Sequence, residues 1–415
     1  FVGNIDVEGE FIPKNTILCT TNTELTQGAE YVNGQYTYRY MQEGKYSNSG
    51  LAWQNITSDG WGVQLTDKAS TDAITSKICS YINNKPLVSA AGTFNKSKAT
   101  ILNLDGLNTS NIINMNGMFS NTQITTLDVS KFNTSKVTNM NGMFSATQLS
   151  TLDLSNFNTS NVTDMSKMFY KSTSLTNIDA SGFDTSKVVN MNGMFTGCTN
   201  LKTLDVSNFK TSKVTDMNNM FEDCSSLTTL DLSNFDTSNV LYMGNPYNYS
   251  YGGMFRNCSS LVSLNISSFN TSKVKYMSNM FQGCSSLTTL DLSNFNTSNV
   301  TAMASMFDSC SSLVSINVSN FDVSSVTDML FMFQNCKSLL NLDLSSFKES
   351  KVITTRQMFY GCNSLETLNI SNFDTSNVTN MTQMFGGCSS LTTLDLSNFN
   401  TSKVTTMYGV FSGCS

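Results

Sequence analysis

The chain has 415 residues, of which 39% are hydrophobic and only 13% are charged, with a formal net charge of −6. A single hydrophobic core stops growing beyond roughly 250–300 residues, so a chain of this length either splits into domains or grows by repetition. The acidic balance argues against nucleic acid and anionic lipid as partners, and the absence of histidine removes the commonest general base and zinc ligand. No apolar run approaches the roughly 18 residues that a membrane-spanning helix needs, so we expect no membrane insertion.

The first hundred residues do not follow the pattern of the rest. Residues 1–58 are predicted to form a β-rich N-terminal segment, in which residues 35–40 alternate between apolar and polar side chains as a strand does. Residues 59–99 are predicted to form a capping segment, with a strand over residues 60–65 and one amphipathic helix over residues 67–84. Stacked repeats need such a cap over their exposed terminal core.

Residues 100–415 consist of about twelve repeats of one unit. A phenylalanine that closes each unit recurs at spacings of 25, 25, 26, 26 and 34 residues and then six times at 26. These residues are Phe119, Phe144, Phe169, Phe195, Phe221, Phe255, Phe281, Phe307, Phe333, Phe359, Phe385 and Phe411. A period of 20–29 residues with regularly spaced leucines is typical of leucine-rich repeats.

Each part of the unit has a structural interpretation. Residues 227–232 alternate as a strand, so Leu230 and Leu232 are predicted to point inward and Asp231 outward. A turn of Ser, Asn, Asp and Thr follows, and Phe235 interrupts it as a core residue. Residues 214–221 have the spacing of a short helical or 3₁₀ turn. We therefore predict a repeat solenoid with a parallel β-sheet and short helical or 3₁₀ turns, preceded by a small α+β cap.

The repeated unit, LTTLDLSNFDTSNV followed by M-x-x-M-F-x-x-C-x-S, resembles the BspA-type leucine-rich repeats of bacterial surface proteins. The resemblance covers residues 100–415 in one register, and residues 59–68 and 78–82 are similar to the leader that precedes such repeats in Firmicutes proteins. It implies secretion or surface display and adhesion to host proteins, glycans or other bacteria. The repeats also resemble those of phage tail and fibre proteins. The resemblance carries no catalytic residues.

The cysteines allow a chemical and a structural interpretation. Nine of the eleven recur once per repeat, at Cys198, Cys224, Cys258, Cys284, Cys310, Cys336, Cys362, Cys388 and Cys414. They could form a metal or redox ladder, but the lack of histidine and of a C-x-x-C motif favours a column of small buried hydrophobic residues. Cys19 and Cys79 lie outside the column and form a possible disulfide in an oxidising compartment. We predict no metal and no cofactor.

Two polar columns run along the predicted solenoid. The outward acidic column comprises Asp128, Asp153, Asp179, Asp205, Asp231, Asn265, Asp291, Asn317, Asp343, Asn369 and Asp395. Repulsion between neighbouring carboxylates is expected to raise their pKa values, and calcium binding or a hydrogen-bonded ladder are the two alternatives. A second column of Lys and Asn, such as Lys136, Asn161 and Lys187, is expected to balance part of this charge. Paired carboxylates on an open face lack the pocket that a glycosidase needs, so we predict no enzyme.

One repeat carries an insertion rich in tyrosine. Rigid aromatic rings on Gly, Asn and Ser loops are typical of binding surfaces, so we predict ligand contacts here, although the insertion could instead fold its rings over the repeats. The predicted ligand-binding residues are Tyr242, Asn245, Tyr247, Asn248, Tyr249 and Tyr251.

The sequence therefore favours a non-enzymatic, extracellular adhesion protein at a cell surface or on a virion, which binds a host or bacterial surface protein or glycan. The alternative is a structural spacer or receptor-binding fibre subunit of a phage tail or extracellular filament. The chain starts at Phe1 and stops at Ser415, where the next strand is due. We therefore expect processing from something larger, with either more chain beyond residue 415 or end-to-end self-association.

Overall fold

The computed structural model describes residues 3–5, 11–13, 16–44, 57, 59–66, 77–102, 104, 106–245 and 252–414. The chain forms two compact units, residues 1–188 and residues 189–415, and each is described by itself. Over the described residues, no helix has the length and apolar character needed to cross a bilayer.

The first unit begins with β-strands. Strands β1 (Gly3–Ile5) and β2 (Phe11–Pro13) pair with each other, and the other six form one sheet in the order β3-β7-β8-β6-β5-β4. These six are β3 (Leu18–Cys19), β4 (Glu30–Asn33), β5 (Tyr36–Gln42), β6 (Trp61–Leu65), β7 (Tyr81–Ile82) and β8 (Lys85–Ser89). The predicted strands over 35–40 and 60–65 are confirmed as β5 and β6. These two strands pair with each other, although the predicted boundary at residue 58 separates them in the sequence. The domain boundaries at 58 and 99 remain a prediction.

The helix predicted over residues 67–84 is wrong in its described part. Residues 67–76 lie outside the described residues, but β7 occupies Tyr81–Ile82 and pairs antiparallel with β8. Asn83 and Asn84 both have positive φ, 48° and 64°, and they turn the chain tightly between the two strands. Consecutive residues with positive φ favour a hairpin turn of this kind and are incompatible with a continuing helix.

The N-terminal sheet packs directly on the first repeat. Ser89 at the end of β8 forms a parallel bridge with Asn114, and the ring of Tyr36 meets Phe94 edge-on at 6.4 Å between centroids. Phe94 in turn stacks on Phe119 at 5.4 Å. The aromatic column of the repeats therefore continues into the β-sheet.

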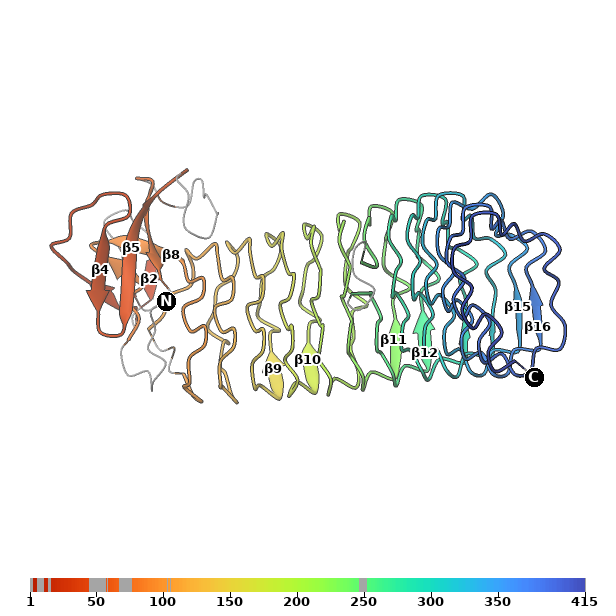
Figure 1. The fold of residues 1–415 in the computed structure, drawn as a ribbon. Coiled ribbons are helices and arrows are strands. Elements are labelled where there is room, and N and C mark those ends of the chain that lie inside the picture. Colours follow the sequence, from red (N-terminus) through yellow and green to blue (C-terminus); the bar gives the residue numbers. More distant parts are fainter. Residues whose placement is uncertain are drawn as a thin grey trace. The chain divides into compact units, whose positions relative to one another are not determined.

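Successive repeats of the first unit stack as parallel turns of chain (Figure 1). Strand β9 (Thr151–Asp153) pairs in parallel with β10 (Asn177–Asp179). A second parallel ladder links Asn114, Asn139 and Asp164 through single bridges. Within the core, the rings of Phe119, Phe144 and Phe169 stack at 5.7 and 5.9 Å.

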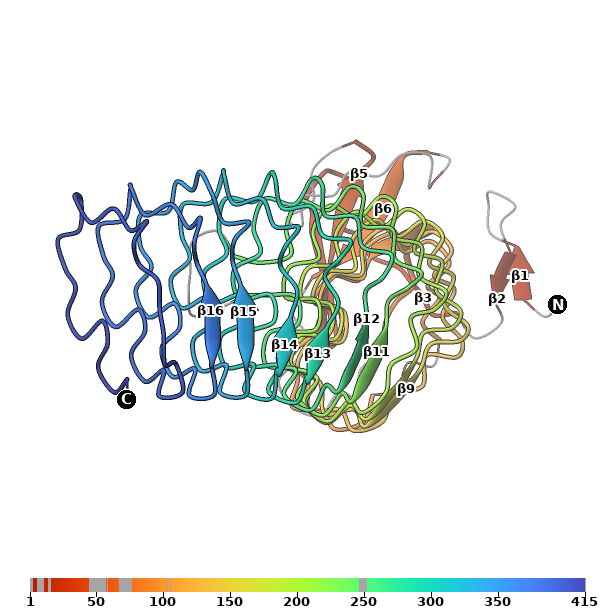
Figure 2. The same cartoon turned by 90° about the vertical axis from the view of Figure 1, so that its right-hand side faces the viewer.

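The second unit has the same construction, and its strands lie side by side in Figure 2. Strand β11 (Thr229–Asp231) pairs with β12 (Ser263–Asn265), and a four-stranded parallel sheet follows in the order β13-β14-β15-β16. These four strands are β13 (Thr289–Leu290), β14 (Ser315–Ile316), β15 (Asn341–Asp343) and β16 (Thr367–Asn369). Leu230, Leu232 and Phe235 are buried and Asp231 is exposed, which confirms their predicted directions.

The predicted helical or 3₁₀ turns are absent from the described repeats. The segment between the methionines forms single hydrogen-bonded turns, as in Met143 N–H to Met140 O at 3.1 Å and Ser145 N–H to Gly142 O at 3.0 Å. Gly142 and Ala146 both have positive φ, so right-handed residues never run consecutively for long enough to form a helix. Intervening N–H groups bond the next repeat instead, as Phe144 N–H does to Met168 O at 2.9 Å.

Candidate functional site

The tyrosine-rich insertion leaves the repeat through a narrow neck. Other repeats place two residues between their paired methionines, and here residues 244–253 take that place. Gly244 and Gly253 form an antiparallel bridge, and Met254 N–H bonds Met243 O at 2.9 Å. A Cβ on Gly253 would lie 2.2 Å from the backbone oxygen of Asn279, so the neck requires glycine there.

Of the predicted binding residues, only Tyr242 and Asn245 are described, and Tyr247, Asn248, Tyr249 and Tyr251 lie outside the described residues. The ring of Tyr242 stacks on that of Tyr276 at 5.8 Å, with 10° between the ring planes. Tyr276 occupies the same position in the next repeat, where neighbouring repeats have Asp216 and Ala302. The sequence prediction missed Tyr276, although aligning the two repeats would have found it.

A partly buried series of polar side chains anchors the end of the insertion. The Gly252 N–H and the Arg256 guanidinium both donate to Glu222 Oε1, at 3.2 and 2.9 Å. Arg256 Nε also donates to Gln282 Oε1 at 2.7 Å, and Gln282 Nε2 donates to Asp308 Oδ2 at 2.8 Å. Burial raises the pKa of Asp308. This series of hydrogen bonds links side chains from four repeats. The charged groups beside the neck are therefore stable there, because each has a hydrogen-bond partner.

A groove of about 640 Å³ lies on the strand face of the second unit. Its exposed side chains form two rows, one of Ser, Asn and Thr and one of Asn and Asp, on either side of the inward-pointing residues. The lining residues are Ser315, Ile316, Asn317, Asn341, Leu342, Asp343, Thr367, Leu368, Asn369, Thr393 and Asp395. The groove therefore crosses the strands, because each row takes one residue from each successive repeat.

The acidic column of this face does not behave as predicted. The expected rise in pKa is wrong for Asp128, Asp153, Asp179, Asp231, Asp291, Asp343 and Asp395, whose pKa values are all lowered. At Asp153 the backbone N–H and the hydroxyl of Ser155 lower the pKa, and repulsion from Asp179 is the weakest influence. Hydrogen bonds to the charged form outweigh repulsion between exposed carboxylates, which water screens.

The column of Lys and Asn bonds within itself. Lys187 Nζ donates to Asn161 Oδ1 at 2.7 Å, and Asn161 Nδ2 donates to the Ser135 carbonyl at 2.7 Å. Lys273 and Lys403 repeat this contact with Asn239 and Asn377, each at 2.7 Å. These lysines thus bind amide oxygens of the preceding repeat, and their balancing of the acidic column stays a prediction.

The repeat cysteines are free thiols, eight of them buried and Cys414 half-buried. Each thiol from Cys224 onward donates to the carbonyl of a phenylalanine one repeat earlier, as Cys310 Sγ does to Phe281 O at 3.1 Å. Burial raises the pKa of Cys284 to about 12. No cluster of three or more Cys, Asp or Glu among the described residues has the arrangement of a metal site.

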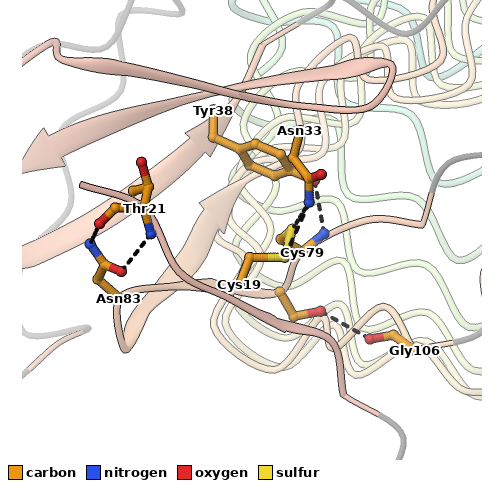
Figure 3. The surroundings of a disulfide bond; sticks show 8 residues. Cys19, Thr21, Asn33, Tyr38, Cys79, Asn83 and Gly106 are labelled. Carbon is orange, nitrogen blue, oxygen red and sulfur yellow. Dashed lines mark hydrogen bonds between the residues drawn. A yellow bond between two sulfur atoms is a disulfide. The ribbon is translucent and has the colours of Figure 1, made fainter. Parts of the chain in front are cut away.

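Cys19 and Cys79 are joined by a disulfide bond (Figure 3). Asn33 Nδ2 donates to both sulfur atoms, at 3.3 and 2.9 Å, and the Cys79 N–H donates to the Tyr38 hydroxyl at 2.8 Å. The disulfide ties the short edge strand β3 to the residues just before β7, and the Tyr38 side chain of β5 lies beside it (Figure 3).

Comparisons with known proteins place the repeats in a family. No curated protein matches the sequence. A crystal structure of a leucine-rich repeat protein from Eubacterium ventriosum is 14% identical over 87% of this chain and 92% of that chain, with a TM-score of 0.28. The TLR13–ssRNA13 complex is 15% identical over 66% of this chain and 59% of that chain, with a TM-score of 0.15.

One family model matches four successive stretches, residues 88–181, 176–252, 248–367 and 339–415. These matches overlap and together span far more than half of the chain. The chain therefore belongs to the family described as "Mycoplasma protein of unknown function, DUF285".

Proposed function

We propose that this chain is a non-enzymatic binding protein displayed outside the cell, at a cell surface or on a virion. The strand face of its repeats contacts a protein or glycan on a host or bacterial surface. The observation that carries the proposal is the groove of about 640 Å³ between two rows of exposed polar side chains. The resemblance to BspA-type repeats supports adhesion, and the Cys19–Cys79 disulfide supports an oxidising compartment.

The state of the carboxylates supports binding over catalysis. A glycosidase needs one carboxyl group that stays protonated near neutral pH, which requires a raised pKa. Asp343 and Asp395 in the groove have lowered pKa values, because Ser345 and Ser397 donate hydrogen bonds to them. Both carboxylates are ionised at neutral pH and act as hydrogen-bond acceptors only.

The stacked pair of Tyr242 and Tyr276 supports a second contact beside the neck of the insertion. Each phenol has an apolar ring and a polar tip, a combination that suits both sugar and protein ligands. Tyr242 forms single parallel bridges with Asp216 and Tyr276, whereas the groove is lined by residues on and beside the strands. We therefore treat the two contacts as separate.

The test measures binding of fluorescently labelled protein to bacterial and epithelial cells. A variant lacking residues 244–251 leaves Gly252 and Gly253 between Met243 and Met254, which restores the two-residue link of the other repeats. Thr367→Arg places a bulky cation in the groove, and Lys187→Gln, in the column of Lys and Asn, is the control. We expect Thr367→Arg to reduce binding at least tenfold, the deletion to reduce it severalfold, and the control to leave it unchanged.

The outcomes separate the two contacts and the alternative function. Unchanged binding by the deletion variant removes the insertion from the proposal, whereas unchanged binding by Thr367→Arg removes the groove. If the wild-type protein binds no cells, adhesion is contradicted and the spacer or fibre subunit is favoured. The near-uniform stacking of the phenylalanine rings, such as 5.8 Å for both Phe195–Phe221 and Phe281–Phe307, is the observation that favours this alternative.

A further inference from the structure

From Asp231 onward, the strand face of the second unit has a period of two repeats. Its outward row begins with two acids, Asp205 and Asp231, and then alternates between amide and carboxylate at Asn265, Asp291, Asn317, Asp343, Asn369 and Asp395. The following inward position alternates in step between leucine and a β-branched residue at Leu232, Ile266, Leu292, Val318, Leu344, Ile370 and Leu396. The chemistry of this face therefore repeats every second strand.

Direct contacts connect the alternating side chains. Asn369 Nδ2 donates to Asp343 Oδ1 at 2.9 Å, and Asn369 Oδ1 accepts the Ser371 N–H at 3.2 Å. The amide is thus both donor and acceptor, whereas the carboxylate offers acceptor sites alone. A ligand that crosses the strands meets these two hydrogen-bonding patterns in alternation.

The groove gives such a ligand a path. Leu342 and Leu368 point into the core, so the backbone between the rows is flanked by Asn341 and Thr367 on one side and by Asp343 and Asn369 on the other. The trough runs from Ser315 to Asp395, across four successive repeats. Its walls consist of hydroxyl, amide and carboxylate groups, and no aromatic side chain lines it.

We propose that this trough binds a neutral, linear, β-1,4-linked polysaccharide, which crosses the strands with one sugar per repeat. The inference rests on the proposed binding function of the strand face and names its class of ligand. Neighbouring strands lie about 4.8 Å apart, and one ring of an extended β-1,4-linked chain advances by a similar distance, roughly 5 Å. Successive rings are turned over, so the sugar chain also repeats every second unit.

Other polymers fit this face less well. An extended peptide advances about 3.3 Å per residue and repeats its side chains at about 6.7 Å, so it falls out of step with the strands. An anionic polysaccharide is repelled by Asp343 and Asp395, which are ionised, and by the net charge of −6. Without aromatic stacking each sugar contributes little, so affinity must come from several sugars bound together.

The length of the ligand provides the first test. Cello-oligosaccharides and N-acetyl-chito-oligosaccharides of two to six sugars are titrated into the whole chain by isothermal titration calorimetry, with α-1,6-linked glucose oligosaccharides as the linkage control. We expect at least one β-1,4-linked series to gain tenfold or more in affinity between two and four sugars and then to level off. Equal affinity at all lengths, binding of the α-1,6 series alone, or no binding overturns the proposal.

A matched pair of variants provides the second test. Asn369→Asp keeps the acceptor for the Ser371 N–H but places three carboxylates in succession with Asp343 and Asp395. Asn296→Asp makes the same change in a turn away from the groove, where Asp322 holds the equivalent place one repeat later. We expect a fivefold or greater loss of affinity for Asn369→Asp and none for Asn296→Asp. Both variants should be folded at the assay temperature, with Asn369→Asp melting lower because it loses the hydrogen bond to Asp343. Equal effects of the two variants overturn the proposal.

These tests are independent of the cell-binding experiment. Oligosaccharide binding without cell binding supports the ligand class and contradicts adhesion to the cells tested. Cell binding that Thr367→Arg abolishes, together with no oligosaccharide binding, overturns the polysaccharide and favours a protein ligand for the same groove.

Discussion

At the scale of single residues, the serine after each outward acid or amide determines the chemistry of the strand face. At all eleven positions of the outward column from Asp128 to Asp395, the Oδ1 atom accepts the N–H of a serine two positions later, at 2.9–3.2 Å. Asp and Asn make this turn equally well, because each offers the same acceptor oxygen. The fold therefore requires a hydrogen-bond acceptor at this position, and either a charged or a neutral side chain can provide it.

The first prediction concerns Asp291. The N–H and hydroxyl of Ser293 lower its pKa, so folding favours the charged form. This stabilisation is present above the ordinary aspartate pKa of about 4 and is lost as the pH falls through the lower folded-state pKa. We expect Asp291→Asn to melt like the wild type at pH 7 and Asp291→Ala to melt at a lower temperature, because alanine leaves the Ser293 N–H without its acceptor.

Melts at acidic pH test the direction of the pKa shift of Asp291. In thermal melts from pH 7 to pH 2, wild type and Asp291→Asn should melt together above about pH 5, and the variant should melt at the higher temperature below about pH 4. A difference that does not change with pH would contradict the cause assigned to the lowered pKa.

The second prediction concerns the thiol column. Burial raises the pKa values of Cys284 and Cys388 to about 12, so both thiols are protonated at pH 8 and shielded from reagents. We expect native protein to react rapidly with a disulfide reagent at no more than the half-buried Cys414, whereas protein unfolded in guanidinium exposes every repeat thiol. Rapid native labelling of Cys224 or Cys310, detected by mass spectrometry of peptides, would show that the column opens.

At the scale of the repeat element, residues with positive φ, in the left-handed region, prevent the turns from continuing as helices. One such position lies between the paired methionines, occupied by Gly142 at φ 58°, Lys167 at φ 55° and Phe331 at φ 60°. A side chain at this conformation costs roughly 1 kcal/mol relative to glycine. At Phe331 the guanidinium of Arg356 lies over the ring at 5.5 Å, a contact that offsets part of this strain.

The third prediction follows from that cost. Lys167 is exposed in the position that Gly142 holds one repeat earlier. We expect Lys167→Gly to increase the free energy of unfolding by about 0.5–1 kcal/mol, measured by urea denaturation, because it removes left-handed strain without removing a core contact. Lys171→Gly, at the second left-handed position (φ 55°), is the matched comparison. A decrease in stability for both variants would contradict this account of the turns.

At the scale of the whole molecule, the N-terminal sheet and the first repeats belong to one unit, and the later repeats form another. Tyr36 is buried against Phe94, which begins the stack of Phe119 and Phe144. In stacked repeats each turn contacts only its neighbours, so stability depends on nearest-neighbour contacts. A substitution that destabilises the N-terminal sheet should therefore destabilise the nearest repeats most and the more distant repeats less.

The fourth prediction uses this coupling. Tyr36→Ala removes a buried ring and should cost about 3–5 kcal/mol within the first unit. Hydrogen exchange should accelerate most around residues 85–119, less around residues 140–169, and not measurably at residues 281–385. Phe333→Ala is the control for a core ring in the second unit and should show the reverse pattern. Uniform acceleration over the chain after Tyr36→Ala would show that the chain unfolds as one cooperative body.

The sequence by itself determined the repeats, because their period, their inward leucines and their phenylalanine column depend on local alternation and spacing. It also predicted strands over residues 35–40 and 60–65, which the structure forms at Tyr36–Gln42 and Trp61–Leu65. It mistook residues 81–84 for helix, because apolar residues at 78, 79, 81 and 82 fit either structure, and only the left-handed Asn83 and Asn84 decide between them. It treated the acidic row as repelling charges, because the hydrogen bonds of the following serines are visible only in the folded turn.

The candidate site shows the same division. The insertion was evident from its 34-residue spacing, but the neck closed by Gly244 and Gly253 and the partner ring of Tyr276 depend on neighbouring turns being in contact. One row of the groove was predicted as part of the outward acidic column, at Asn317, Asp343, Asn369 and Asp395. The hollow between this row and the row of Ser315, Asn341, Thr367 and Thr393 was not predicted, because it depends on how successive strands pack. A periodic sequence thus determines what each turn is made of, and only the stacking of turns determines which side chains form a common surface.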